Sequence, residues 1–247
     1  MIYRITSRSN QRLKDLIKNK DQYYCFEGEK LVRDILQKKL KVEILVVHEN
    51  LEKEFPIPEK VAHETWYAND NVLKKISNLK VTPPAIAILK LKEKEIDFHK
   101  AKVVIVLDNI QDPANAGTVF RCAAAFGVYA VIFSGSSVKP NNPKFLRAAQ
   151  DAIFHVRFQQ VESLDTLIKK ASAAGMNIYL TSALYPGETV SPGNLRSPCL
   201  ILFGNEGQGL PPDLFLSYPS IKIEQTKKVD SLNVGVSACI IMHELKK

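Results

Sequence analysis

Four short, nearly continuous apolar runs in the second half of the chain constrain its fold more than any other feature. They are VVIVLD, AVIFSG, NIYLTSA and CLILFGN, at residues 103–108, 130–135, 177–183 and 199–205. Runs of this kind are typical of strands buried on both faces of a parallel sheet. Helical patterns occupy residues 116–127, 142–154, 163–175 and 231–247. This alternation predicts an α/β domain with an open, mostly parallel sheet.

The first ninety residues predict a smaller α/β unit. Its expected strands lie at residues 23–28, 42–50 and 85–91, and its expected helices lie at residues 10–20 and 29–40. Ser9 is the expected cap of the first helix, and a loop with two prolines is expected at residues 51–60. A charged stretch without apolar periodicity follows the last of these strands. We therefore expect one domain over residues 1–95, a linker over 96–102 and a second domain over 103–247.

Basic residues outnumber acidic ones and are concentrated at the N-terminus. The chain has 34 Lys and Arg against 26 Asp and Glu, a net charge of +8. Residues 1–20 contain six basic side chains and one acidic one, Asp15, for a net charge of +5. A polyanionic partner explains such an excess, because neutralised phosphates supply much of the affinity for nucleic acids. Solvated lysines of an ordinary basic protein explain the charge equally well.

Several functional classes are disfavoured by what the sequence does not contain. No apolar stretch approaches the roughly 18 residues of a membrane span, and the N-terminus lacks the apolar core of a signal peptide. The four cysteines are scattered without a C-x-x-C pair, and the histidines lack metal-ligand spacing, so we expect no metal and a reduced, cytoplasmic protein. Neither a dinucleotide fingerprint nor a P-loop is present, which disfavours dehydrogenases and P-loop nucleotidases.

Three polar loops are expected at the carboxyl ends of the predicted strands, where parallel sheets bind ligands. The first, residues 108–121, contains Asn115 as an expected helix cap and Arg121 inside that helix. The second is FGNEGQGL, residues 203–210, and the third is TKKVDSLNVG, residues 226–235. Each loop alone is also compatible with an ordinary strand-to-helix connection.

The second and third loops have the composition of ligand-binding segments. Glycines at 204, 207 and 209 allow the backbone to approach a ligand closely, and Glu206 lies among them. In the third loop Ser231 or Asp230 is expected to cap the last helix, which would leave backbone N–H groups for a ligand. Three such loops in one domain point to a binding site more strongly than any of them alone.

The three loops together resemble the motifs of the SpoU (TrmH-like) family of RNA ribose 2′-O-methyltransferases, of the knotted SPOUT superfamily. The first motif is matched by Asn115-Ala116-Gly117 with Arg121 behind it, the second by residues 203–210, and the third by VDSLNV at residues 229–234. The match spans residues 103–245. FEGEKLVRDIL at residues 26–36 is similar to the L30e-like substrate-binding domain of this family.

This resemblance implies a trefoil knot at the C-terminal end of the α/β domain, S-adenosylmethionine as cofactor, and a homodimer that completes the active site. The expected cofactor-binding residues are Gly204, Ile223, Leu232 and Thr181. Catalytic and RNA-contacting roles fall on Asn115, Arg121, Glu206, Ser231 and Asn233. The basic side chains expected to contact RNA phosphates are Arg8, Arg12, Lys14 and Lys18.

The implied reaction transfers a methyl group from S-adenosylmethionine to a ribose 2′-hydroxyl of structured RNA. Ribosomal RNA is favoured, because an added N-terminal domain suits docking on a large folded target; transfer RNA is the alternative. The family's motif-one arginine, here Arg121, is commonly assigned as the base. A guanidinium stays protonated, so we expect Arg121 to orient the hydroxyl and stabilise the alkoxide, with the proton leaving to Glu206 or water.

The sequence departs from the family pattern at three positions. Glu224 replaces a proline of the usual I-P-M segment, Ala149 lacks an expected serine hydroxyl, and Asp151 adds an acid. These changes keep open a non-catalytic RNA-binding module with a degenerate methyltransferase domain. A base methyltransferase of the wider knotted superfamily is a third possibility.

Overall fold

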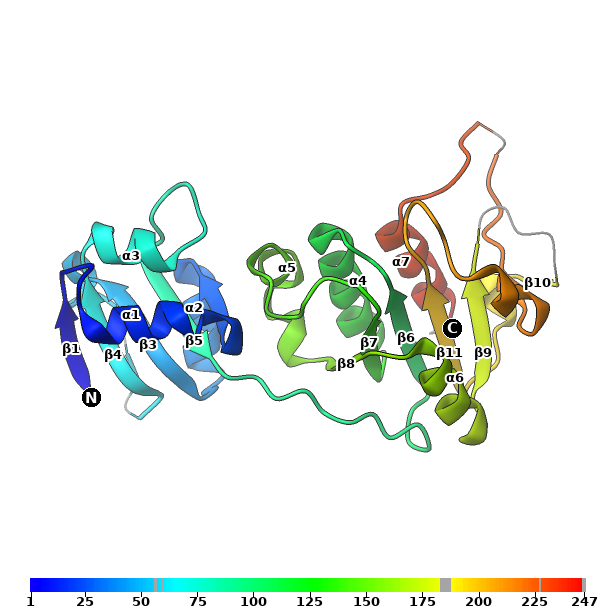
Figure 1. Ribbon diagram of the computed structural model, residues 1–247, viewed down its shortest axis with the longest axis horizontal. Coiled ribbons are helices and arrows are strands. Elements are labelled where there is room, and N and C mark those ends of the chain that lie inside the picture. The colour runs from blue at the N-terminus through cyan, green and yellow to red at the C-terminus, as the bar shows by residue number, and fades with distance from the viewer. Residues whose placement is uncertain (56, 59, 183–187, 227, 246–247) are drawn as a thin grey trace. The chain divides into compact units, whose positions relative to one another are not determined.

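The computed structural model describes residues 1–55, 57–58, 60–182, 188–226 and 228–245 (Figure 1). The parts of predicted segments that lie outside these residues are Pro56 and Glu59 of the expected proline loop, Ala183 of an expected strand, Lys227 of the third polar loop, and Lys246 and Lys247 of the expected last helix. The chain divides into two compact units. Unit 1 comprises Met1–Lys92 and Asn141–Arg147, and unit 2 comprises Glu93–Pro140 and Ala148–Lys247.

Unit 1 is built on a five-stranded mixed sheet in the order β1-β4-β3-β5-β2. Its strands are β1 (Ile2–Ile5), β2 (Tyr24–Glu27), β3 (Val42–His48), β4 (Ala62–Ala68) and β5 (Ala85–Leu89). Its helices are α1 (Gln11–Lys18), α2 (Glu29–Gln37) and α3 (Asp70–Ile76). The pairs β1–β4 and β3–β4 are parallel, whereas β5 runs antiparallel to both its neighbours. Leucines of α1 and apolar residues of α3 pack with Trp66 in one core.

The three strands and two helices expected in this unit are confirmed, but the expected cap is wrong. Asn10, not Ser9, caps α1, because its side-chain oxygen accepts a hydrogen bond from the backbone N–H of Arg12 at 2.9 Å. Three elements of this unit were not predicted: β1, β4 and α3. Half of β4 is polar (AHETWYA), so it lacks the continuous apolar signal of the buried strands.

Unit 2 contains a seven-stranded sheet in the order β10-β12-β9-β11-β6-β7-β8, and every pair in it is parallel. Its strands are β6 (Val103–Asp108), β7 (Ala130–Ser134), β8 (Arg157–Val161), β9 (Asn177–Thr181), β10 (Thr189–Val190), β11 (Cys199–Phe203) and β12 (Ser220–Ile221). Its helices are α4 (Pro113–Phe126), α6 (Leu164–Ala173) and α7 (Val234–Leu245). The helix α5 (Pro143–Ala149) begins in the unit 1 segment Asn141–Arg147 and ends in unit 2. The predicted open parallel α/β sheet is confirmed.

Residues 93–101, which end the first expected domain and form most of the expected linker of residues 96–102, pack on the unit 2 sheet and its edge strand β8. The backbone N–H of Lys94 donates to the carbonyl of Phe158 in the edge strand β8 at 3.2 Å, and the N–H of Gln160 donates to the Glu93 carboxylate at 2.8 Å. Ile96 and Ala101 are buried in the core of unit 2. An exposed sheet edge can pair with another chain. This segment supplies hydrogen-bond partners for part of the β8 edge.

Candidate active site

A cavity of about 550 Å³ lies at the carboxyl ends of β9 and β11, and all four residues expected to bind the cofactor line it: Thr181, Gly204, Ile223 and Leu232. Three of the five expected catalytic residues line it as well: Glu206, Ser231 and Asn233. Pockets of this size accommodate small ligands and cofactors.

Several residues that line the cavity were not among the predicted site residues: Ser182, Phe215, Gln225, Ser237 and Ile241. Ser237 follows Asn233 by one helical turn, so helical periodicity alone would have placed both on one face of α7. Phe215 belongs to a one-turn helix, Pro212–Leu216, that no motif marks.

The loop after β11 is shaped by one glycine and one asparagine. A Cβ atom on Gly204 would lie 2.4 Å from the backbone carbon of Gly209, so only glycine permits this close approach. The side-chain oxygen of Asn205 accepts the backbone N–H groups of Gly207 and Gln208 at 2.9 and 3.0 Å. The loop therefore folds back on itself and presents Glu206 on an exposed turn.

Asn115 lies within α4 rather than at its cap, so the expected capping role is wrong. Asp112 caps the helix by accepting the N–H of Ala114 at 2.9 Å, and Pro113 occupies the first turn, where a missing N–H costs nothing. The buried Asn115 side chain is thereby free to connect the other two loops. Its Nδ2 donates to Glu206 Oε1 at 2.8 Å, and its Oδ1 accepts from Asn233 Nδ2 at 2.8 Å.

The start of α7 lies later than expected, so neither Ser231 nor Asp230 is its cap. The helix begins at Val234, and the Asn233 side-chain oxygen accepts the N–H of Gly235 at 2.9 Å. This carboxamide thus caps α7 with its oxygen and reaches Asn115 with its nitrogen. Ser231 is exposed at the rim of the cavity.

Arg121 is separate from this cluster. It is exposed on α4, it does not line the cavity, and no hydrogen bond or ion pair joins it to any described residue. Within a single chain, four of the five expected catalytic residues are therefore gathered around one cavity or connected to it, and Arg121 is not.

None of the three departures from the family pattern places a charge in the cavity. Glu224 is exposed and does not line the cavity, whereas its neighbours Ile223 and Gln225 do. Ala149 is fully buried where its segment meets Gly117, whose added Cβ would lie 2.8 Å from the Ala149 nitrogen. Asp151 lies 3.6 Å from the His155 imidazole in an exposed pair.

Two buried thiols in unit 2 are poor candidates for nucleophilic chemistry. Burial raises the pKa of Cys199 to about 11. Burial, followed by a hydrogen bond with Cys239, raises the pKa of Cys122 to about 12. The thiolate is the reactive form, so these groups stay protonated and inert at neutral pH.

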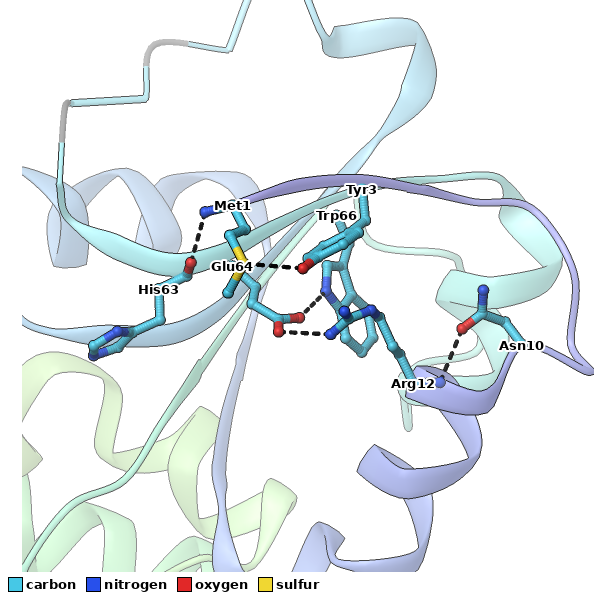
Figure 2. A network of polar contacts seen from close by, with 7 residues as sticks. All are labelled: Met1, Tyr3, Asn10, Arg12, His63, Glu64 and Trp66. Atoms are coloured by element: carbon cyan, nitrogen blue, oxygen red, sulfur yellow. Dashed lines mark hydrogen bonds and ion pairs between the residues drawn. The ribbon is translucent and has the colours of Figure 1, made fainter.

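The four basic residues expected to contact RNA differ in how free they are. The Arg12 guanidinium donates to Glu64 at 2.8 Å and stacks 3.8 Å above the Tyr3 ring, and Trp66 donates to the same carboxylate at 2.7 Å (Figure 2). Arg8 Nε donates to the carbonyl of Asn71 at 3.2 Å. Two exposed side chains have no polar partner among the described residues: Lys14 and Lys18.

Over the described part of the chain, no three His, Cys, Asp or Glu side chains are grouped so that they could hold a metal ion. In the same residues, no helix combines the length and hydropathy needed to cross a membrane.

The fold resembles that of solved structures. A crystal structure of an AdoMet-bound rRNA methyltransferase from Sinorhizobium meliloti superposes with a TM-score of 0.80 at 23% identity, covering 98% of this chain and 97% of that one. This likeness shows that the two-unit fold is shared. The model of the SpoU rRNA Methylase family matches residues 102–243, and the chain belongs to this family.

Two curated relatives extend the comparison. The 23S rRNA (guanosine(2553)-2′-O)-methyltransferase RlmP of Bacillus subtilis is 26% identical over 250 residues, covering 98% of both chains. An uncharacterized tRNA/rRNA methyltransferase of Synechocystis, slr1673, is 33% identical over 148 residues, covering 60% of this chain. The chain spans about half the length of the Synechocystis relative, 54%.

Proposed function

We propose that this protein transfers the methyl group of S-adenosylmethionine to a ribose 2′-hydroxyl of ribosomal RNA. The observation that supports this most is the hydrogen-bonded series Asn233–Asn115–Glu206, which joins three loops at one cavity. The full-length similarity to a 23S rRNA ribose methyltransferase supports the choice of substrate.

The cavity residues suit the cofactor chemically. Apolar walls from Ile223, Leu232 and Phe215 fit an adenine ring, and the hydroxyls of Ser182, Ser231 and Ser237 suit polar ribose and amino-acid groups. The carboxylate of Glu206 supplies a negative charge at the rim, which favours a cationic sulfonium. The bound cofactor would supply an activated methyl group.

The residues of this chain would act mainly by positioning. Asn115 fixes the Glu206 carboxylate, so the charge beside the reacting groups is held in one place without cost at the moment of reaction. Glu206 is exposed and can accept the hydroxyl proton directly or through water. Holding the attacking hydroxyl in line with the methyl group lowers the barrier by removing its freedom of motion.

A second copy of the chain would bring Arg121 to the site. Arg121 lies on the exposed face of α4, and the adjoining α7 exposes Val236 to 47% and Ile240 to 36%. Such apolar side chains on paired helices fit a self-complementary interface. In the homodimer that we propose, Arg121 contacts the RNA at the partner's cavity and stabilises the developing alkoxide.

Unit 1 would be an L30e-like domain that docks the RNA through two exposed lysines of α1, Lys14 and Lys18. We also propose that unit 2 contains a trefoil knot and that the protein is cytoplasmic. Transfer RNA is the alternative substrate, since the Synechocystis relative carries both substrates in its name.

Mapping 2′-O-methyl groups in ribosomal and transfer RNA from a deletion strain tests the proposal. One ribosomal position should lose its methyl group and regain it with the wild-type gene but not with a Glu206→Ala variant. Loss of a methyl group in transfer RNA instead would identify transfer RNA as the substrate. Purified protein that gives no heat with S-adenosylmethionine in titration calorimetry would favour the non-catalytic RNA-binding module instead.

A further inference from the structure

Asn109 connects three segments next to the loop that lines the candidate site. It follows β6 with a backbone φ of 55°, in the left-handed region that asparagine tolerates better than most residues. Its side-chain oxygen accepts both the N–H and the hydroxyl of Ser136 at 2.9 Å, and its backbone carbonyl accepts Asn205 Nδ2 at 2.9 Å. The ends of β6 and β7 and the loop after β11 therefore meet at one residue.

Asp108 sets the orientation of the Asn109 side chain. Its carboxylate is only 3% exposed, and it accepts the hydroxyl of the buried Ser134 at 2.5 Å and Asn109 Nδ2 at 2.9 Å. Because the amide nitrogen of Asn109 faces this carboxylate, the amide oxygen must face Ser136. A buried charge with two donors holds its neighbours more firmly than a neutral group would.

Asn205 transmits this arrangement to the cavity. Its nitrogen is held by Asn109, and its oxygen accepts the N–H groups of Gly207 and Gln208. Both Asn205 and the residues it holds line the cavity, whereas Asp108 and Asn109 do not. Any effect of Asp108 and Asn109 on a ligand must therefore act through the loop.

We propose that Asp108 and Asn109 are positioning residues for the cofactor: they hold Asn205, and through it the loop of residues 204–210, in the shape that binds S-adenosylmethionine. The inference rests on the proposed function, since it assumes that this cavity takes the cofactor. It goes beyond it by giving the buried carboxylate Asp108 a role in cofactor affinity.

Asn205→Asp is the most direct test. The new carboxylate still accepts the two loop N–H groups, but it loses the donor to Asn109 and repels that carbonyl. We expect the Kd for S-adenosylhomocysteine, which is the cofactor without the sulfonium charge that a new carboxylate would attract, to rise about tenfold in titration calorimetry, the effect of one lost hydrogen bond. The affinity for RNA should fall by much less than this, which separates an effect on the cofactor loop from a general folding defect.

Asp108→Asn tests the residue behind the loop. The isosteric amide turns a nitrogen towards Ser134 or Asn109 and removes the charge, so we expect the cofactor Kd to rise about fivefold with unchanged affinity for RNA. Lys39→Gly is a matched control, because Lys39 also has a positive φ, 53°, but lies exposed in unit 1. It should leave cofactor affinity unchanged.

Cofactor affinity at the wild-type level in both variants would overturn the inference. Parallel losses of cofactor and RNA affinity would also overturn it, because they would indicate a general folding defect. Asn205→Asp is less prone to such a defect than Asp108→Asn, because Asn205 is only half-buried and lies in a loop. Failure of the wild-type protein to bind S-adenosylmethionine would instead refute the proposed function.

Discussion

Asn115 donates a hydrogen bond to Glu206 over 2.8 Å, although 91 residues separate them in the chain. The other end of the same carboxamide accepts from Asn233, so one buried side chain connects three loops. Removing it leaves the polar atoms of both partners without their bond. The consequences for stability and for the reaction can be measured separately.

Asn115→Ala should lower the free energy of unfolding by about 1–3 kcal/mol, because it removes both hydrogen bonds made by a buried side chain. Urea unfolding measures this change. Gln111→Ala, an exposed position just before the same helix, should change stability by less than about 0.5 kcal/mol. Equal stability of the two variants would mean that the Asn115 bonds contribute little.

Glu206→Gln should weaken binding of the cationic cofactor by about tenfold, since the amide still accepts from Asn115 but lacks the charge. S-adenosylhomocysteine, which has no sulfonium charge, should bind both proteins equally. Glu162→Gln, at an exposed carboxylate outside this cavity, is the control. Equal losses for both ligands would argue against an electrostatic role of Glu206.

Arg121→Lys should reduce turnover by about 100-fold, because a compact ammonium lacks the planar fork of a guanidinium. Cofactor affinity should be unchanged, since Arg121 does not line the cavity. The exposed Arg196→Lys serves as the matched control. Near-normal turnover in Arg121→Lys would contradict a role for this side chain both as base and as alkoxide stabiliser.

Replacing Lys14 and Lys18 together by alanine should weaken RNA binding. The slope of the logarithm of the binding constant against the logarithm of salt concentration should become shallower by about one to two units. Cofactor binding should be unaffected. Lys74 and Lys75 of α3, exposed in the same unit, allow a variant with the same loss of charge. If both pairs change the salt dependence equally, the α1 lysines contact RNA phosphates no more than other exposed lysines of the unit do.

Alkaline pH should destabilise the protein in part through Cys199. Burial raises its pKa from 9.0 to about 11, so between these values the unfolded chain loses a proton that the folded chain keeps. The free energy of unfolding should therefore fall as pH rises from 9 to 11. Cys199→Ala should show a flatter profile in urea unfolding at several pH values. Identical profiles would mean that Cys199 titrates alike in both states.

Continuous apolar runs made four strands of unit 2 predictable, because a strand buried on both faces needs an apolar residue at every position. The edge strand β8, with the sequence RFQQV and one buried residue, has no such run and was missed. Half-polar β4 was missed for the same reason. The residues around the cavity were predictable only through motif resemblance, since each loop alone also suits an ordinary connection.

The sequence by itself determined the parallel α/β class, the three polar loops and the family to which the chain belongs. These follow from local order along the chain, which sequence patterns report directly. Only the tertiary structure decided that Asn115 bridges Glu206 and Asn233 instead of capping α4, that Glu64 holds Arg12, and that Arg121 lies apart. Such roles depend on which distant residue supplies the hydrogen-bond partner, and no local pattern encodes that choice.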